Sequence, residues 1–239
     1  MKIELDLDKT RELNELYHTT RERDRKEPHL SDDPYCPMKA FNRIKGLKEI
    51  WSRKTRARFN IGEDLHGEFE LPFKHKEVPI HFMSSIGHPD VVYTDDRKKT
   101  VCGPLEFKHT TLLVPTFLDI PSAWIRQVRL ECVYLSKHYQ KIVKEGWLAI
   151  LELIPGTGKV YHLIFDWSEI ENIATDHIHF LRILTKALDE DNPDLLTINP
   201  NECSTCQFNH DDGCPKRPTV RRPSKVFGCP IKVIKDAGP

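Results

Sequence analysis

The residues best suited to chemistry in this sequence are two carboxylates and a lysine between positions 90 and 108. Glu106 and Lys108 are two apart in a stretch that predicts a strand, so their side chains point to the same face. Asp90 lies at one end of the preceding predicted strand and can reach that face. Carboxylates hold Mg²⁺ or Mn²⁺, which lowers the pKa of a bound water and offsets charge on a scissile phosphate. The set therefore predicts metal-assisted phosphodiester cleavage, with the lysine orienting the water or stabilising the transition state.

The residues around Glu106 and Lys108 decide whether the two form a catalytic site or a surface ion pair. An isolated Glu-x-Lys pair is usually a solvated surface ion pair, which contributes little. Here Gly62-x-x-x-His66 lies upstream on a predicted helix, Gly87-x-x-Asp90 precedes the pair, and Gln127 lies on a helix that follows. A histidine alone is more often structural than a ligand. The order of the motifs reverses that judgement.

These motifs, in this order, resemble the RecB-type branch of the PD-(D/E)XK nucleases. The resemblance implies that His66, Asp90 and Glu106 bind the metal and that Lys108 is the catalytic lysine. It gives Gln127 a role in supporting the phosphate or the active site. Because imidazole suits Mn²⁺ better than Mg²⁺, His66 favours manganese.

The helix of Gln127 departs from the family pattern at one position. The family usually has a tyrosine four residues after this glutamine, and here Glu131 stands at that position. Tyr134, seven residues after Gln127, returns to nearly the same helix face. Glu131 and Tyr134 are both weaker candidates for the site.

The cysteines form a second group with ligand spacing. Four of the seven lie in the last 37 residues, where Cys203-x2-Cys206 is followed by Cys214. The chain begins without a secretory signal, so a disulfide framework is not expected. A tetrahedral site needs a fourth ligand, which Cys229 supplies for zinc; an iron–sulfur cluster is the alternative. The spacing alone leaves both open.

The segment around Cys36 resembles an element of two nuclease groups. Tyr35-Cys36-Pro37-Met38-Lys39-Ala40-Phe41 is similar to the upstream C-P-x-K/R-x-[FY] element of CRISPR-associated RecB-type and AddB-type nucleases. Those groups carry one cysteine before the nuclease motifs and three after them. The resemblance implies a 4Fe–4S cluster on Cys36, Cys203, Cys206 and Cys214, with Cys229 as a spare. Cys102 and Cys132 are expected to be buried small hydrophobic residues.

Hydrophobic periodicity gives the expected elements and the fold class. We expect helices at 39–58, from residue 60, at 122–144 and at 176–189. We expect strands at 78–83, 89–93 and 101–108, and a hairpin of 147–154 with 160–165. This order predicts an α/β protein with a mixed central sheet. The resemblance to the nucleases implies that this sheet is restriction-endonuclease-like and flanked by helices. The expected organisation is an N-terminal helical segment (1–58), a nuclease core (59–198) and an iron–sulfur segment (199–239) that joins the two chain ends.

The charges balance overall but not locally. The 36 basic and 36 acidic residues exclude a uniformly basic surface, yet 39–58 carries +7 and 215–239 carries +6. We therefore expect DNA phosphate contacts from the basic residues of the first segment: Arg43, Lys45, Arg53, Lys54, Arg56 and Arg58. No apolar run is long enough to span a membrane, and we expect a cytoplasmic protein without a membrane partner.

The resemblance also implies a function. It implies an exonuclease on single-stranded DNA or DNA ends, with a 5′→3′ component, that trims ends during CRISPR spacer acquisition in antiviral defence. The implied partner is the integrase complex. The alternatives are a virus- or repair-associated exonuclease with the same motifs, and a non-catalytic, zinc-containing adaptor that binds DNA ends.

Overall fold

The computed structural model describes most of the chain between Lys26 and Ile198 and a few positions beyond it. The described residues are 26–47, 49–50, 78–95, 100–110, 117–152, 157–198, 203, 206, 208, 214 and 215. The expected helix from residue 60, with His66, lies outside them. None of the described helices is long and apolar enough to cross a membrane.

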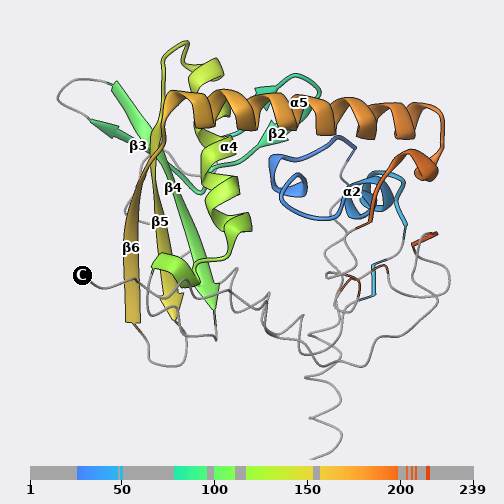
Figure 1. Cartoon of the computed structure of the whole chain (residues 1–239), viewed down its shortest axis with the longest axis horizontal. Coiled ribbons are helices and arrows are strands. Elements are labelled where there is room, and N and C mark those ends of the chain that lie inside the picture. The colour runs from blue at the N-terminus through green and yellow to red at the C-terminus, as the bar shows by residue number, and fades with distance from the viewer. Residues whose placement is uncertain are drawn as a thin grey trace, which may run out of the picture.

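A four-stranded mixed sheet forms one side of the molecule (Figure 1). Its strands are β3 (Val91–Asp95), β4 (Thr100–Thr110), β5 (Glu145–Glu152) and β6 (Thr157–Ile164), in that order. β4 and β5 are parallel, whereas the β3–β4 and β5–β6 pairs are antiparallel. The mixed central sheet and the β5–β6 hairpin are therefore confirmed. A Cβ atom at Gly103 would collide with the carbonyl of Glu145, so only glycine lets β4 and β5 approach here.

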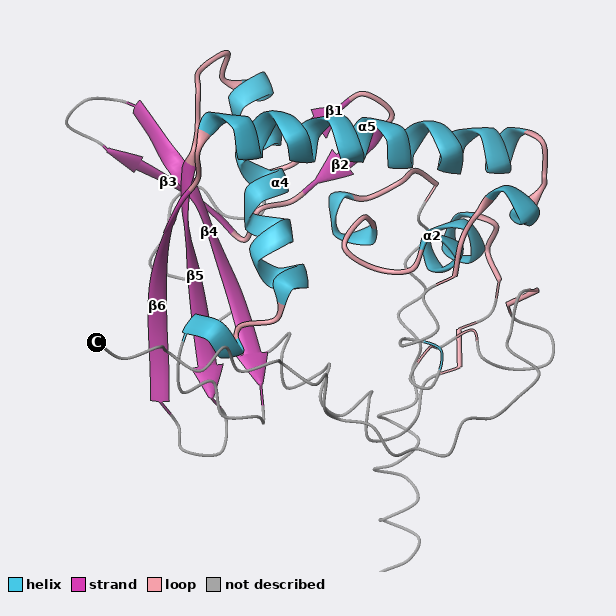
Figure 2. Cartoon of the chain, viewed as in Figure 1, coloured by secondary structure: helices cyan, strands magenta, loops and turns pink. Residues whose placement is uncertain are grey.

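Two long helices lie on one side of this sheet (Figure 2). α4 (Ser122–His138) is the crossover between the parallel strands and packs on β4 and β5. α5 (Trp167–Asp189) packs against α4. It starts nine residues earlier than expected, because Asp166 and Glu169 form a capping box and Ile170 and Ile173 of the first turns are buried.

The expected helix at 39–58 is shorter in the structure. α2 (Pro37–Ile44) ends where Gly46 adopts a positive φ of 69°, a conformation that favours glycine and stops a helix. Residues 51–58 lie outside the described part. Upstream of β3, the structure has a small hairpin of β1 (Ile80–Phe82) and β2 (Ser85–Gly87), and β2 was missed because three residues give no periodicity.

The hydrophobic core has two parts, and α5 contributes to both. The larger lies between the sheet and the helices and includes Leu130, Leu148 and Leu181. The smaller joins α2 to the second half of α5, through Cys36, Met38, Ala40, Phe41, Leu184, Ala187 and Leu196. α5 thus connects α2 to the sheet domain. Figure 1 shows α5 running from the sheet to α2.

Candidate active site

The predicted carboxylates meet at the start of β3 and the middle of β4. Val91 pairs with Leu105, so the residue before Val91, Asp90, lies beside the segment that carries Glu106. The Asp90 carboxylate accepts a hydrogen bond from the amide of Phe107 at 2.6 Å. Glu106 is 2% exposed. It faces α4, because its carboxylate accepts a hydrogen bond from Gln127 of that helix.

Lys108 and Gln127 complete a hydrogen-bonded cluster with Glu106. The ammonium of Lys108 donates to the Glu106 carboxylate and to Oε1 of Gln127, the latter at 3.0 Å. Nε2 of Gln127 donates to Oε1 of Glu106 at 2.6 Å and to Oε1 of Glu131 at 3.1 Å. The structure thus brings together four of the five predicted site residues, while His66 lies outside the described residues. Their catalytic role stays a prediction.

Charge interactions govern protonation in this cluster. Burial by itself would lower the pKa of Lys108, but the negative charges of Glu106 and then Asp90 outweigh it and raise the pKa well above 10.5. Lys108 is therefore a cation. For Glu131, burial raises the pKa well above its ordinary value, and the charges of Glu106 and Asp90 add to the effect.

The cluster fits a divalent cation. The second carboxylate oxygen of Glu106 is buried and has no hydrogen-bond partner among the residues that the structure describes. Such oxygens are costly unless a proton or a cation meets them. Within the described ranges, no three His, Cys, Asp or Glu side chains form a group that could hold a metal. Mg²⁺ commonly takes only one or two carboxylates plus waters and substrate phosphate, so Asp90 and Glu106 suffice as protein ligands.

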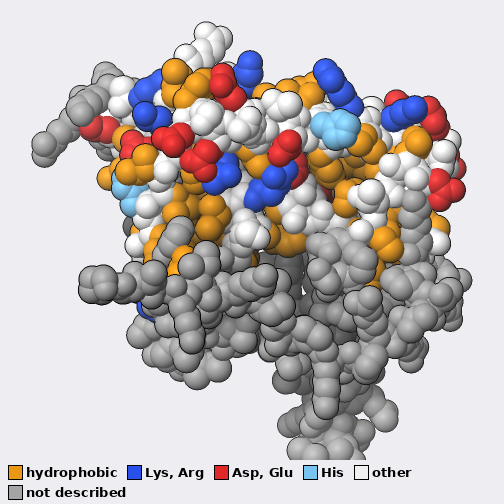
Figure 3. All heavy atoms as spheres, in the orientation of Figure 1, with side chains coloured by type: hydrophobic (Ala, Val, Ile, Leu, Met, Phe, Trp, Pro, Cys, Tyr) orange, Lys and Arg blue, Asp and Glu red, His pale blue; other side chains and the backbone are white. Residues whose placement is uncertain are grey.

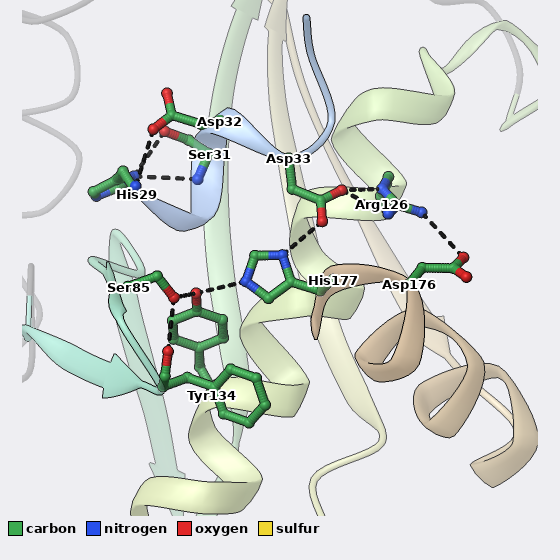
Figure 4. A network of polar contacts seen from close by, with 10 residues as sticks. His29, Ser31, Asp32, Asp33, Ser85, Arg126, Tyr134, Asp176 and His177 are labelled. Carbon is green, nitrogen blue, oxygen red and sulfur yellow. Dashed lines mark hydrogen bonds and ion pairs between the residues drawn. The ribbon is translucent and has the colours of Figure 1, made fainter. Parts of the chain in front are cut away.

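The two weaker candidates on α4, Glu131 and Tyr134, have different neighbours in the structure. Glu131 lies beside Gln127, one helical turn away, and so belongs to the cluster. The Tyr134 hydroxyl forms hydrogen bonds with His177 at 2.8 Å and with Ser85 (Figure 4). Because Tyr134 lies two helical turns, about 10 Å, along α4 from Gln127, it meets different neighbours. Its role in the site stays a prediction.

Tyr134 belongs to a second polar cluster, which sequence reasoning missed. We call it the Asp33 network: Asp33, Ser85, Arg126, Tyr134 and His177. Nδ1 of His177 and the Asp33 carboxylate are 2.6 Å apart, and Arg126 of α4 donates to the same carboxylate at 2.6 Å (Figure 4). The network joins the segment before α2 to α4, α5 and the β1–β2 hairpin. Burial chiefly raises the pKa of Tyr134, so this hydroxyl stays protonated.

The cysteines are partly described. Cys36 is buried at the N-terminus of α2, and Cys214 packs against the same core. The amide of Cys206 bonds the carbonyl of Cys203 at 3.4 Å. Cys132 is buried as expected, but Cys102 is only half-buried and lies where the pairing register between β3 and β4 shifts.

Two of the predicted DNA-contacting residues, Arg43 and Lys45, lie in the described part of the chain, and both have acidic partners. Arg43 contacts Asp32 at 3.3 Å and Glu49 at 2.8 Å, and Lys45 contacts Asp191 at 2.7 Å. Arg53, Lys54, Arg56 and Arg58 lie outside the described residues. On the face in Figure 3, basic and acidic side chains are interspersed. The DNA-binding role of these residues stays a prediction.

Comparison with known proteins gives distant structural matches only. No family model and no curated protein matches the chain. The crystal structure of SSO0001 is 16% identical with a TM-score of 0.47, and the match covers 88% of this chain and 95% of that one. LHK-Exo in complex with dAMP is 12% identical with a TM-score of 0.45, covering 71% and 93%.

A second structure of LHK-Exo, an alkaline exonuclease from Laribacter hongkongensis, is 13% identical with a TM-score of 0.41, covering 75% and 97%. These identities and TM-scores are low. The chemistry proposed for this chain therefore rests on its own side chains.

Proposed function

We propose that this protein is a metal-dependent deoxyribonuclease. The observation that carries the proposal is the hydrogen-bonded cluster of Glu106, Lys108 and Gln127, in which one buried carboxylate oxygen of Glu106 has no hydrogen-bond partner among the described residues. Asp90 lies beside it on the neighbouring strand and accepts a hydrogen bond from the amide of Phe107. Phosphodiester cleavage needs charge neutralisation at the phosphate and an activated water, and the two carboxylates and the lysine are suited to both.

Each residue has a distinct part in the proposed reaction. Asp90 and Glu106 would hold the divalent cation, which supplies a water of lowered pKa and neutralises phosphate charge. The amide of Phe107 fixes the Asp90 carboxylate. Lys108 places a permanent positive charge beside the cation site, where it stabilises negative charge that develops on the phosphate. Gln127 holds the Lys108 ammonium through its side-chain oxygen.

The finer proposal is an exonuclease on single-stranded DNA or DNA ends, with 5′→3′ polarity, that acts in CRISPR spacer acquisition beside the integrase complex. Its support is the resemblance of the ordered motifs. His66 is the proposed third ligand and the reason to expect Mn²⁺. A virus- or repair-associated exonuclease is the alternative with the same chemistry.

Asp90→Asn tests the proposed function. Loss of a ligand charge should weaken cation binding, so cleavage of labelled single-stranded DNA should fall about 10–100-fold at limiting Mn²⁺ and recover partly as Mn²⁺ is raised. The measurement is the initial rate at several Mn²⁺ concentrations, with a chelator as blank. Asp95→Asn, the same change at the far end of β3, is the matched control.

If Asp90→Asn, Asp95→Asn and wild type degrade DNA equally, the activity comes from another site or another protein. If pure wild type binds DNA ends but never cleaves them with Mn²⁺ or Mg²⁺, the non-catalytic adaptor is the better description.

We infer further that Cys36, Cys203, Cys206 and Cys214 hold a 4Fe–4S cluster with a structural role. Burial of Cys36 and packing of Cys214 against the same core support this ligand pair. A cluster there would join segments about 170 residues apart in sequence, and binding energy of a metal centre adds to folding energy.

Cys36→Ala should therefore remove the brown colour and lower the melting temperature. Cys102→Ala, a half-buried cysteine on β4, should leave both unchanged. Iron, sulfide and zinc are measured in the anaerobically purified proteins. Stoichiometric zinc without iron, or iron retained in Cys36→Ala, would contradict the inference.

A further inference from the structure

Glu131 stands at the position where the motifs described above usually have a tyrosine. It lies on α4 one turn after Gln127, is 1% exposed, and accepts a hydrogen bond from Nε2 of Gln127 at 3.1 Å. A carboxylate in such surroundings is costly, and an apolar side chain of similar size would fill the same space at less cost. Its presence therefore points to a task other than filling the core.

The hydrogen bonds of Gln127 define that task. A glutamine amide has one oxygen that accepts and one nitrogen that carries two protons. Glu106 accepts one proton of Nε2 and Glu131 accepts the other, while Oε1 accepts from Lys108. All three contacts match donor to acceptor in this orientation of the amide.

A reversed amide would mismatch all three contacts. The oxygen would face the carboxylates of Glu106 and Glu131, and the NH₂ group would face the ammonium of Lys108. Glu106 by itself can satisfy only one proton of Nε2. Glu131, the second acceptor, binds the remaining proton. The amide of Gln127 is then held against rotation about its terminal bond.

We propose that Glu131 is a positioning residue that fixes the Gln127 amide, so that Oε1 of Gln127 holds the Lys108 ammonium in place. The consequence for activity rests on the proposed nuclease function; the consequence for the amide does not. Glu131 acts through its oxygen as an acceptor, and not as a ligand or as a charge.

Two substitutions separate these roles. Glu131→Leu removes the acceptor and keeps an apolar side chain of similar volume, so kcat should fall about 10–100-fold, as for other supporting residues of metal sites, while KM changes little. The melting temperature should not fall, because a costly buried carboxylate is removed. Glu131→Gln keeps a carbonyl acceptor and should recover most of kcat.

The matched control is Glu152→Leu, which replaces another buried carboxylate, on β5, that pairs with Lys159. It should leave kcat near the wild-type value. Equal loss of kcat in Glu131→Leu and Glu131→Gln would show a charge or ligand role and overturn the proposal. A loss of kcat that parallels a fall in melting temperature in both Glu131→Leu and Glu152→Leu would also overturn the proposal.

A spectroscopic measurement tests the amide without relying on catalysis. In ¹⁵N spectra, the side-chain NH₂ of Gln127, assigned by its loss in Gln127→Met, should exchange slowly with solvent in wild type and in Glu131→Gln. Exchange should be at least tenfold faster in Glu131→Leu. Unchanged exchange in Glu131→Leu would overturn the proposal even in an active enzyme, whereas an inactive wild type with the expected exchange would overturn only the nuclease function.

Discussion

Replacing Lys108 by methionine should lower kcat for DNA cleavage about 10²–10³-fold, the usual cost of removing one group that stabilises transition-state charge. Methionine keeps the length of the side chain but has no charge and no donor. Because the ammonium of Lys108 donates to Glu106 and Gln127, both groups also lose a partner. The expected loss lies in kcat, since the developing charge on the phosphate exists mainly in the transition state.

The protonation of Lys108 makes this prediction specific. The negative charges of Glu106 and Asp90 raise the pKa of Lys108 above its ordinary value when no cation is bound, so the side chain is positively charged at neutral pH. Lys108→Arg should recover little, because a planar guanidinium cannot replace a compact ammonium that has two fixed acceptors.

Lys159→Met is the control for Lys108→Met. Lys159 pairs with the buried Glu152 across β5 and β6 at 3.0 Å, so the same lysine–glutamate contact on the same sheet is broken. Melting temperatures measured with the rates show whether loss of folding contributes. If the two variants lose the same activity at the same melting temperature, Lys108 has no catalytic role.

Local sequence spacing was enough to predict the inner part of the candidate site. A period of two puts Glu106 and Lys108 on one face of any strand, and residues 105–110 of β4 pair with β5 without a break. Gln127 lies on a helix whose apolar stripe already fixes the buried face. Glu131 was within reach of the same reasoning through its spacing of four, but the family pattern drew attention to a tyrosine instead.

The Asp33 network could not be predicted in this way. His177 and Asp33 are 144 positions apart, and Ser85 and Tyr134 are 49 apart. No periodicity links residues at such separations, because tertiary packing alone brings them together. The same holds for the start of α5, which depends on a cap and on the core that its first turns meet.

The two polar clusters share one short segment of chain. Asp33 is anchored by His177 and Arg126, and Tyr35, two residues later, is near enough to Lys108 to affect its pKa. Cys36 follows at the start of α2. The Asp33 network therefore holds the segment that lies beside the candidate site on one side and carries a proposed cluster ligand on the other.

Asp33→Ala should cost about 3–5 kcal/mol of the free energy of unfolding, the range expected when one partner of a buried charged pair is removed. The Asp33 side chain is 1% exposed, and its carboxylate meets His177, which is fully buried, and Arg126. The substitution leaves His177 without its Nδ1 partner in a place that water does not reach. Urea denaturation measures the effect, as a lower midpoint with an unchanged slope.

Asp176→Ala is the control. Asp176 is exposed and makes a long contact of 3.9 Å with the same Arg126. The substitution should therefore lower the free energy of unfolding by less than about 0.5 kcal/mol. The double variant Asp33→Leu with His177→Leu should be more stable than the sum of the single changes predicts, since neither buried polar group is then left unpaired. An Asp33→Ala cost as small as that of Asp176→Ala would contradict a role for the network. Strict additivity would instead mean that Asp33 and His177 act independently, and the segment before α2 would then be held by its apolar contacts alone.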